Sequence, residues 1–113
     1  MNIENIQAQL AAFAEERDWD QFHSPKNLCM ALAGESGELL EIFQWLTQGG
    51  SERSALSKDQ LQSATDELAD ILIYSLRLAD RLGIDLESAI LEKIEKNAAR
   101  YTIEVARGNA VKR

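Results

Sequence analysis

Acidic residues at helical spacing are the feature of this sequence with the clearest capacity for chemistry. Glu35 and Glu38 are three residues apart, as are Glu67 and Asp70, so each pair would lie on one face of a helix. Both pairs have apolar or small neighbours, and neither has a lysine or arginine four residues further on. Because a divalent cation removes the penalty of taking unpaired carboxylates out of water, the pairs predict a cation site between two helices. The alternative is that both pairs lie on solvated helix faces.

The predicted ligands indicate which cation this would be. Carboxylate oxygens suit a hard ion such as Mg²⁺, with Mn²⁺ as a substitute. One cysteine and one histidine leave too few ligands for a typical zinc site. Di-iron helical bundles need Glu-x-x-His pairs, and the sequence contains none.

Side chains that could bind an organic ligand flank these pairs. Four of them lie close to the ends of the second predicted helix: Trp19, Phe22, His23 and Trp45. Tyr74 follows Asp70 by four residues and so shares its helix face. Lys93 and Asn97 share one face of the fourth predicted helix, where they suit phosphate oxygens or, equally, solvent. The aromatic side chains are equally explained as core residues.

The elements that must position these residues are helices. Apolar residues recur at helical spacing, and one proline and six glycines leave too few turn signals for a β protein. Four helices are predicted to follow four N-cap residues: Asn2, Ser24, Ser57 and Asp85. The second should run to about Leu46 and the third should stop at Gly83. The tail from about residue 102 has no clear period and is predicted to be extended or loosely packed.

Length and pattern predict one all-α domain over residues 1–113, an antiparallel four-helix bundle. Wide apolar arcs on the second and third helices predict a homo-oligomer. A net charge of −7 disfavours nucleic acid as a partner. No apolar run approaches the roughly 20 residues of a membrane span, and no signal peptide is evident. The single cysteine fits a reducing, cytoplasmic compartment.

The order of these motifs resembles the MazG-like all-α nucleoside triphosphate pyrophosphohydrolases. The shared signature is Glu-x-x-Glu at 35–38, 28 intervening residues, then Glu-x-x-Asp at 67–70. Further segments are similar to the dCTP pyrophosphatase branch of that family: 17–23, 25–27, 34–39, 43–45, 93–101 and 106–108. The chain departs from the branch at Leu10, where a histidine can stand, so one base contact is not carried over.

The resemblance implies a function and a set of roles. It implies cleavage of a deoxynucleoside triphosphate to monophosphate and pyrophosphate, with dCTP or a modified cytosine nucleotide favoured, as nucleotide-pool house-cleaning. The four acids of the signature would bind Mg²⁺, and Glu38 is favoured over Glu41 as the general base. The implied nucleotide contacts are Trp19, His23, Trp45 and Tyr74. The family also implies a homodimer or a tetramer of two dimers.

Two alternatives stay open at this point. One is a dUTP or phosphoribosyl-ATP type pyrophosphohydrolase on the same scaffold, against which the segment from Trp19 to His23 argues. The other is a non-catalytic helical interaction module whose acids are surface charge. The module predicts no effect of metal on stability, whereas a cation site predicts that Mg²⁺ raises the melting temperature.

Overall fold

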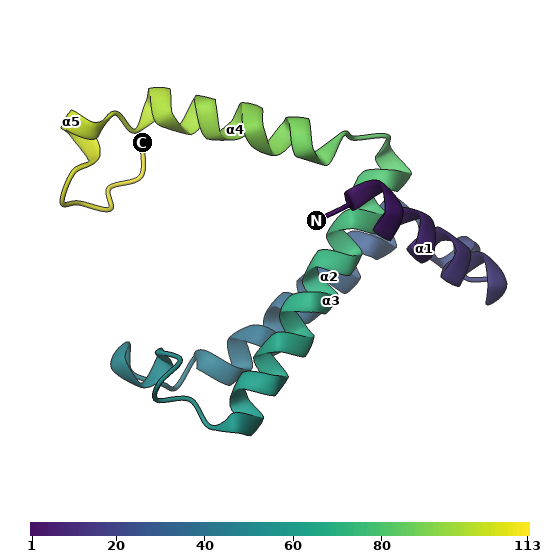
Figure 1. Cartoon of the computed structure of the whole chain (residues 1–113), viewed down its shortest axis with the longest axis horizontal. Helices are drawn as coiled ribbons and strands as arrows, with labels where there is room; N and C mark the ends of the chain where they lie inside the picture. Colours follow the sequence, from purple (N-terminus) through teal and green to yellow (C-terminus); the bar gives the residue numbers. More distant parts are fainter. The chain divides into compact units, whose positions relative to one another are not determined.

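The computed structural model describes residues 1–113 as helices and connecting turns, with no β-strand (Figure 1). Its helices are α1 (Ile3–Glu16), α2 (Pro25–Phe43), α3 (Lys58–Leu82), α4 (Leu86–Arg100) and α5 (Ile103–Ala106). Two short 3-10 helices lie between them, η1 (Asp20–Phe22) and η2 (Gly49–Ser51). The predicted all-α class is confirmed. The chain divides into two compact units, Met1–Gly83 and Ile84–Arg113, so the single domain stays a prediction.

The predicted helix starts are confirmed by their capping hydrogen bonds. The side chains of all four predicted N-caps accept from the backbone three residues further on: Asn2, Ser24, Ser57 and Asp85. Ser57 and Gln60 form a reciprocal capping box. Gly83 adopts a left-handed conformation, with φ of 66°, and ends α3 where the sequence predicted.

Two boundaries differ from the prediction. Helix α2 ends at Phe43, about one turn before Leu46, and a turn follows in which the Leu46 N–H donates to the Phe43 carbonyl at 2.9 Å. The tail is not wholly extended, because α5 forms between residues 103 and 106. Four residues are too few for a periodic apolar pattern to be recognised in the sequence.

The first unit is built on an antiparallel helical hairpin. Figure 1 shows α2 and α3 side by side, and α1 packs on α3. The Gln7 amide on α1 donates to the Leu76 carbonyl on α3 at 2.9 Å. The buried apolar residues are few: Ala14, Leu28, Leu76 and Ala79. Helix α3 is therefore the central element, in contact with both other helices of the unit.

Much of the apolar surface of the hairpin is exposed in the single chain. Six large apolar residues of α2 and α3 are exposed: Met30, Leu40, Leu68, Leu72, Ile73 and Leu82. Soluble monomers rarely leave this much apolar surface uncovered. No helix is long and apolar enough to span a membrane.

The second unit consists of α4, α5 and the chain end. The Tyr101 hydroxyl accepts from the Arg113 backbone N–H at 2.9 Å, and the Arg113 guanidinium donates to the Val105 carbonyl at 3.0 Å. These bonds fold the segment after α5 back towards the end of α4.

Candidate metal centre and adjoining cavity

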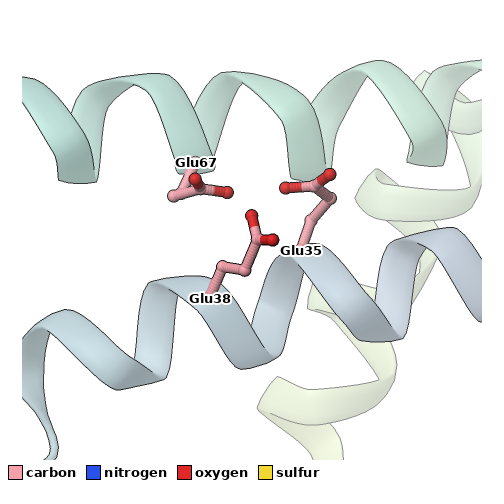
Figure 2. A group of neighbouring side chains, drawn as sticks. All are labelled: Glu35, Glu38 and Glu67. Atoms are coloured by element: carbon pink, nitrogen blue, oxygen red, sulfur yellow. The ribbon is translucent and has the colours of Figure 1, made fainter.

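Three carboxyl groups meet between α2 and α3. Glu35 and Glu38 project from α2 and Glu67 projects from α3 towards them (Figure 2). One oxygen from each residue lies within 4.8 Å of the others. Glu35 and Glu67 are half-buried, and Glu38 is exposed. We refer to these three residues as the acid cluster.

The acid cluster follows from spacing and topology. Residues three apart lie on the same helix face, which aligns Glu35 with Glu38 on α2. The antiparallel partner then presents Glu67 opposite them. Helix α2 continues unbroken through Gly34 and Gly37, and no close contact within the chain requires glycine there, because a Cβ at either position would have no neighbour within 4 Å.

The acid cluster is electrostatically incomplete. One oxygen of Glu35 and one of Glu67 are buried without a hydrogen-bond partner. The closeness of Glu35, which favours a proton shared between the two carboxyls, raises the pKa of Glu67 to about 7, and desolvation and Glu38 act in the same direction. The chain supplies no cation to offset three converging acids.

A divalent cation fits this arrangement. The donors are all carboxylate oxygens, they converge, and two of them lack any other partner. Hard cations such as Mg²⁺ prefer this donor set and keep water or substrate oxygens in their remaining positions. Glu35, Glu38 and Glu67 are thus the residues placed to hold one.

Asp70, the fourth predicted ligand, lies one turn further along α3 and outside the acid cluster. It lines a cavity of about 390 Å³ instead. We call this the aromatic cavity, and its walls are formed by eight residues: Leu10, Phe13, Trp19, His23, Asp70, Ile73, Tyr74 and Arg77. Its volume is within the range of small-molecule sites. Trp19 packs edge-on to Phe13, with ring centroids 5.7 Å apart.

On the other side of the acid cluster is an open polar hollow. It is lined by Glu38, Glu41, Ile42, Ser63 and Glu67. Glu41, the second candidate for general base, is therefore beside the acid cluster.

One face of α3 connects the three features. Five of its residues recur at alternating intervals of four and three, and so share that face: Ser63, Glu67, Asp70, Tyr74 and Arg77. At 1.5 Å per residue they extend over roughly 21 Å. Polar hollow, acid cluster and aromatic cavity thus follow one another along a single helix.

Buried charge closes the far wall of the aromatic cavity. Arg77 is only 6% exposed, and its guanidinium pairs with Asp20 at 2.6 Å and with Asp80 at 3.6 Å. Its Nε–H also donates to His23 Nδ1 at 3.4 Å. Desolvation lowers the pKa of His23, and the nearby positive charge of Arg77 lowers it further. Asp20 raises this pKa, whereas Arg81 lowers it by a smaller amount. We call Arg77, Asp20, Asp80 and His23 the arginine network.

The predicted binding residues are only partly brought together. Trp19, His23 and Tyr74 line the aromatic cavity, whereas Phe22 and Trp45 do not, and Trp45 is 87% exposed. The predicted ligand contacts of all five stay predictions.

The other two predicted binding residues are on α4 in the second unit. Lys93 and Asn97 are both exposed there, and their role also stays a prediction.

Sequence reasoning missed the arginine network. Arg77 is seven residues after Asp70, so the periodicity of α3 could have placed it on the same face as the acids. Its partner Asp20 is 57 residues away, and no local pattern links the two.

The sequence is similar to a known protein family and to named proteins. Residues 31–112 match the MazG-like family. The chain is 46% identical to dCTP pyrophosphatase 1 from Bos taurus and 44% identical to that from Homo sapiens, over 97% of its own length. It spans 65% of the length of each of these relatives.

A solved structure shares the fold. The crystal structure of a pyrophosphatase from Archaeoglobus fulgidus superposes with a TM-score of 0.81 at 36% identity. The match covers 90% of this chain and 94% of that one.

Proposed function

The chain belongs to the MazG-like family, and on that premise we propose that it is a nucleoside triphosphate pyrophosphohydrolase. It would cleave its substrate between the α and β phosphates, releasing a nucleoside monophosphate and pyrophosphate. The observation that carries this proposal is the order along α3, where the acid cluster lies between a polar hollow and an aromatic cavity. The aromatic cavity suits a nucleobase, and a cation held by the acid cluster would offset the charge of a triphosphate beside it on the same helix face.

Glu35, Glu38 and Glu67 would hold Mg²⁺, with Asp70 as a further ligand. When bound, the ion would neutralise the triphosphate and lower the pKa of a coordinated water. The partnerless buried oxygens of Glu35 and Glu67 support this assignment, since a cation gives them the partner that they lack.

Glu38 is the favoured general base. It is the exposed member of the acid cluster and also lines the polar hollow, so it can reach both solvent and a phosphate there. A carboxylate in that position can accept the proton of an attacking water. Glu41 lines the same hollow and is the alternative.

The aromatic cavity would bind the base. Trp19 and Phe13 offer ring surfaces, and Tyr74 adds a third ring on the α3 side. The names of the curated relatives support dCTP as the substrate, and a modified cytosine nucleotide would satisfy the same cavity. The biological role that follows is removal or balancing of deoxynucleotides.

The experiment that tests the proposal measures pyrophosphate release from a panel of dNTPs and NTPs, with Mg²⁺ and with EDTA. The wild type is compared with Glu38→Gln and with Glu15→Gln, which removes an exposed acid of α1 as a matched control. Release that depends on metal, persists in Glu15→Gln and is lost in Glu38→Gln supports the proposal. A folded protein that releases pyrophosphate from no nucleotide contradicts it and favours the interaction module.

We also propose that the active form is a homo-oligomer, a dimer or a tetramer of two dimers, in the cytoplasm. The exposed apolar residues of the α2–α3 hairpin support assembly, because a second copy would cover them. Light scattering coupled to size-exclusion chromatography gives the mass directly. A stable monomer at micromolar concentration would contradict this part of the proposal.

A further inference from the structure

His23, in the wall of the aromatic cavity, lies beside the buried side chain of Arg77. Arg77 donates its Nε–H to His23 Nδ1. A guanidinium has donors only and stays protonated in proteins, so the nitrogen that accepts from it carries no proton. In the neutral ring the single proton is then on Nε2.

The neutral form is favoured by the surroundings. Arg77 is a buried cation directly beside the imidazole, and Arg81 adds a more distant positive charge, whereas Asp20 alone favours the imidazolium. Asp20 also accepts a hydrogen bond from Arg77 at 2.6 Å, so the guanidinium offsets much of the negative charge that Asp20 presents to the imidazole. A second proton on His23 would break the hydrogen bond from Arg77.

The Nε2 side of the ring has no partner in the chain. The Nδ1 side of the ring is occupied by Arg77. The ring also lies edge-on to Trp19, with 6.2 Å between the two ring centroids. His23 lines the aromatic cavity, so its free N–H is available to whatever occupies that cavity.

We propose that Arg77 is a positioning residue that holds His23 as the Nε2–H tautomer, and that this N–H selects a base with an unprotonated ring nitrogen. The selection rests on the proposed function, which places a nucleobase in the cavity. Cytosine offers an acceptor at its N3, whereas uracil and thymine carry a proton there. A fixed N–H donor therefore stabilises bound cytosine by a hydrogen bond to N3, whereas it faces a second donor in uracil and thymine.

Asp20 and Asp80 hold the side chain of Arg77 in place. They hold the Arg77 Nη groups at 2.6 Å and 3.6 Å, which leaves Nε directed at the imidazole. Asp20 is in η1, three residues before His23, so the same short segment supplies both the anchor of the arginine and the ring that it orients.

The first test uses the fact that the chain contains one histidine, so its ¹⁵N spectrum needs no assignment. Long-range ¹H–¹⁵N spectra of ¹⁵N-histidine-labelled protein near neutral pH should show the proton on Nε2. Arg77→Met should shift the ring towards a tautomer mixture, whereas Arg81→Met, which removes a neighbouring exposed arginine, should leave the proton of the neutral ring on Nε2. A wild-type ring protonated at Nδ1 overturns the proposal whatever the variants do.

The second test measures dissociation constants of dCMP and dUMP by calorimetry in the presence of Mg²⁺. We expect the wild type to prefer dCMP by about 3- to 10-fold, the effect of one neutral hydrogen bond, and Arg77→Met to lose that preference. A purely structural role for Arg77 would weaken both ligands equally and keep their ratio, which would overturn the proposal. Arg81→Met should keep the wild-type ratio.

If Arg77→Met does not fold, Asp20→Asn provides the second variant, since it retains Arg77 and removes its nearest anchor. We expect the same changes in tautomer and ratio, to a smaller extent, and an unchanged ratio and tautomer would contradict the account. Monophosphate binding is independent of hydrolysis. Failure to release pyrophosphate with intact dCMP selectivity would therefore refute the proposed function alone, and the reverse would refute the inference alone.

Discussion

The acid cluster and the arginine network, two regions on the same face of α3, satisfy their charges in opposite ways. In the acid cluster three carboxyls of like charge converge, two of their oxygens have no partner, and no basic side chain compensates them. In the arginine network one buried cation meets two carboxylates and an imidazole nitrogen of the same chain. The acid cluster needs something that the chain does not contain, whereas the Arg77 cation finds all of its partners within the chain.

This difference separates a binding site from its support. Groups that are left unsatisfied in the folded chain are available to a ligand, because binding removes their penalty. Groups that are already satisfied hold geometry and gain little from a ligand. Substitutions in the acid cluster should therefore change catalytic activity and metal binding. Substitutions in the arginine network should change the stability of the fold and the selectivity for the nucleobase.

The largest expected effect is on turnover, in Glu38→Gln. Loss of a carboxylate that both holds the cation and accepts a proton should lower the rate of Mg²⁺-dependent pyrophosphate release by about 10²–10⁴-fold. Initial rates at saturating nucleotide measure this. Glu15→Gln should retain the wild-type rate, and an equal loss in both variants would contradict a specific role for Glu38.

The cavity between the two regions gives the next largest effect. Trp19→Ala removes a ring from the aromatic cavity and should weaken nucleotide binding by about 5- to 100-fold, the range seen for loss of one base-stacking side chain. The change should appear in KM more than in kcat. Phe22→Ala serves as the matched control, since Phe22 is outside the cavity. If Phe22→Ala has the larger effect, the cavity is not the base site.

The two regions should respond oppositely to removal of one acid in the metal-free protein. Glu67→Gln relieves repulsion and should raise the melting temperature, while abolishing the further increase that Mg²⁺ causes in the wild type. Asp20→Asn leaves a buried guanidinium with only its weaker partner and should destabilise by about 1–2 kcal/mol, less than for a fully buried pair because Asp20 is half exposed. Differential scanning calorimetry in EDTA and in Mg²⁺ checks both signs.

The smallest effect is a pH dependence confined to the acid cluster. The folded chain raises the pKa of Glu67 from 4.5 to about 7, so the folded state holds an extra proton at mildly acidic pH. That contribution to stability is present below the ordinary carboxyl pKa and is lost as the pH rises through about 7. The melting temperature of the metal-free wild type should fall over this interval.

Glu67→Gln supplies the control for the pH dependence, since it should show no such fall. Stabilisation by Mg²⁺ should instead grow with pH, because the cation competes with the proton. A metal-free wild type whose stability rises with pH in this range would contradict the raised pKa.

The sequence predicted the parts of this site that depend on local rules. Each N-cap, at Asn2, Ser24, Ser57 and Asp85, depends on a side chain that can accept a hydrogen bond from the backbone three residues further on. The alignment of Glu35 with Glu38 follows from helical spacing. The meeting of α2 with α3 follows from the loop that joins them.

Other features depend on packing between distant segments and were not predictable in this way. The pairing of Arg77 with Asp20 depends on how η1 folds over α3. The position of Asp70, in the cavity wall rather than in the acid cluster, depends on how α2 packs on α3.

The measurement that tests the central claim most directly is a titration of the metal-free protein with Mn²⁺, followed by the electron paramagnetic resonance of the free ion. The account predicts saturable binding in the wild type and in Glu15→Gln, and strong weakening in each of Glu35→Gln, Glu38→Gln and Glu67→Gln. Equal binding by the wild type and all three cluster variants would contradict the claim that these carboxylates form a cation site.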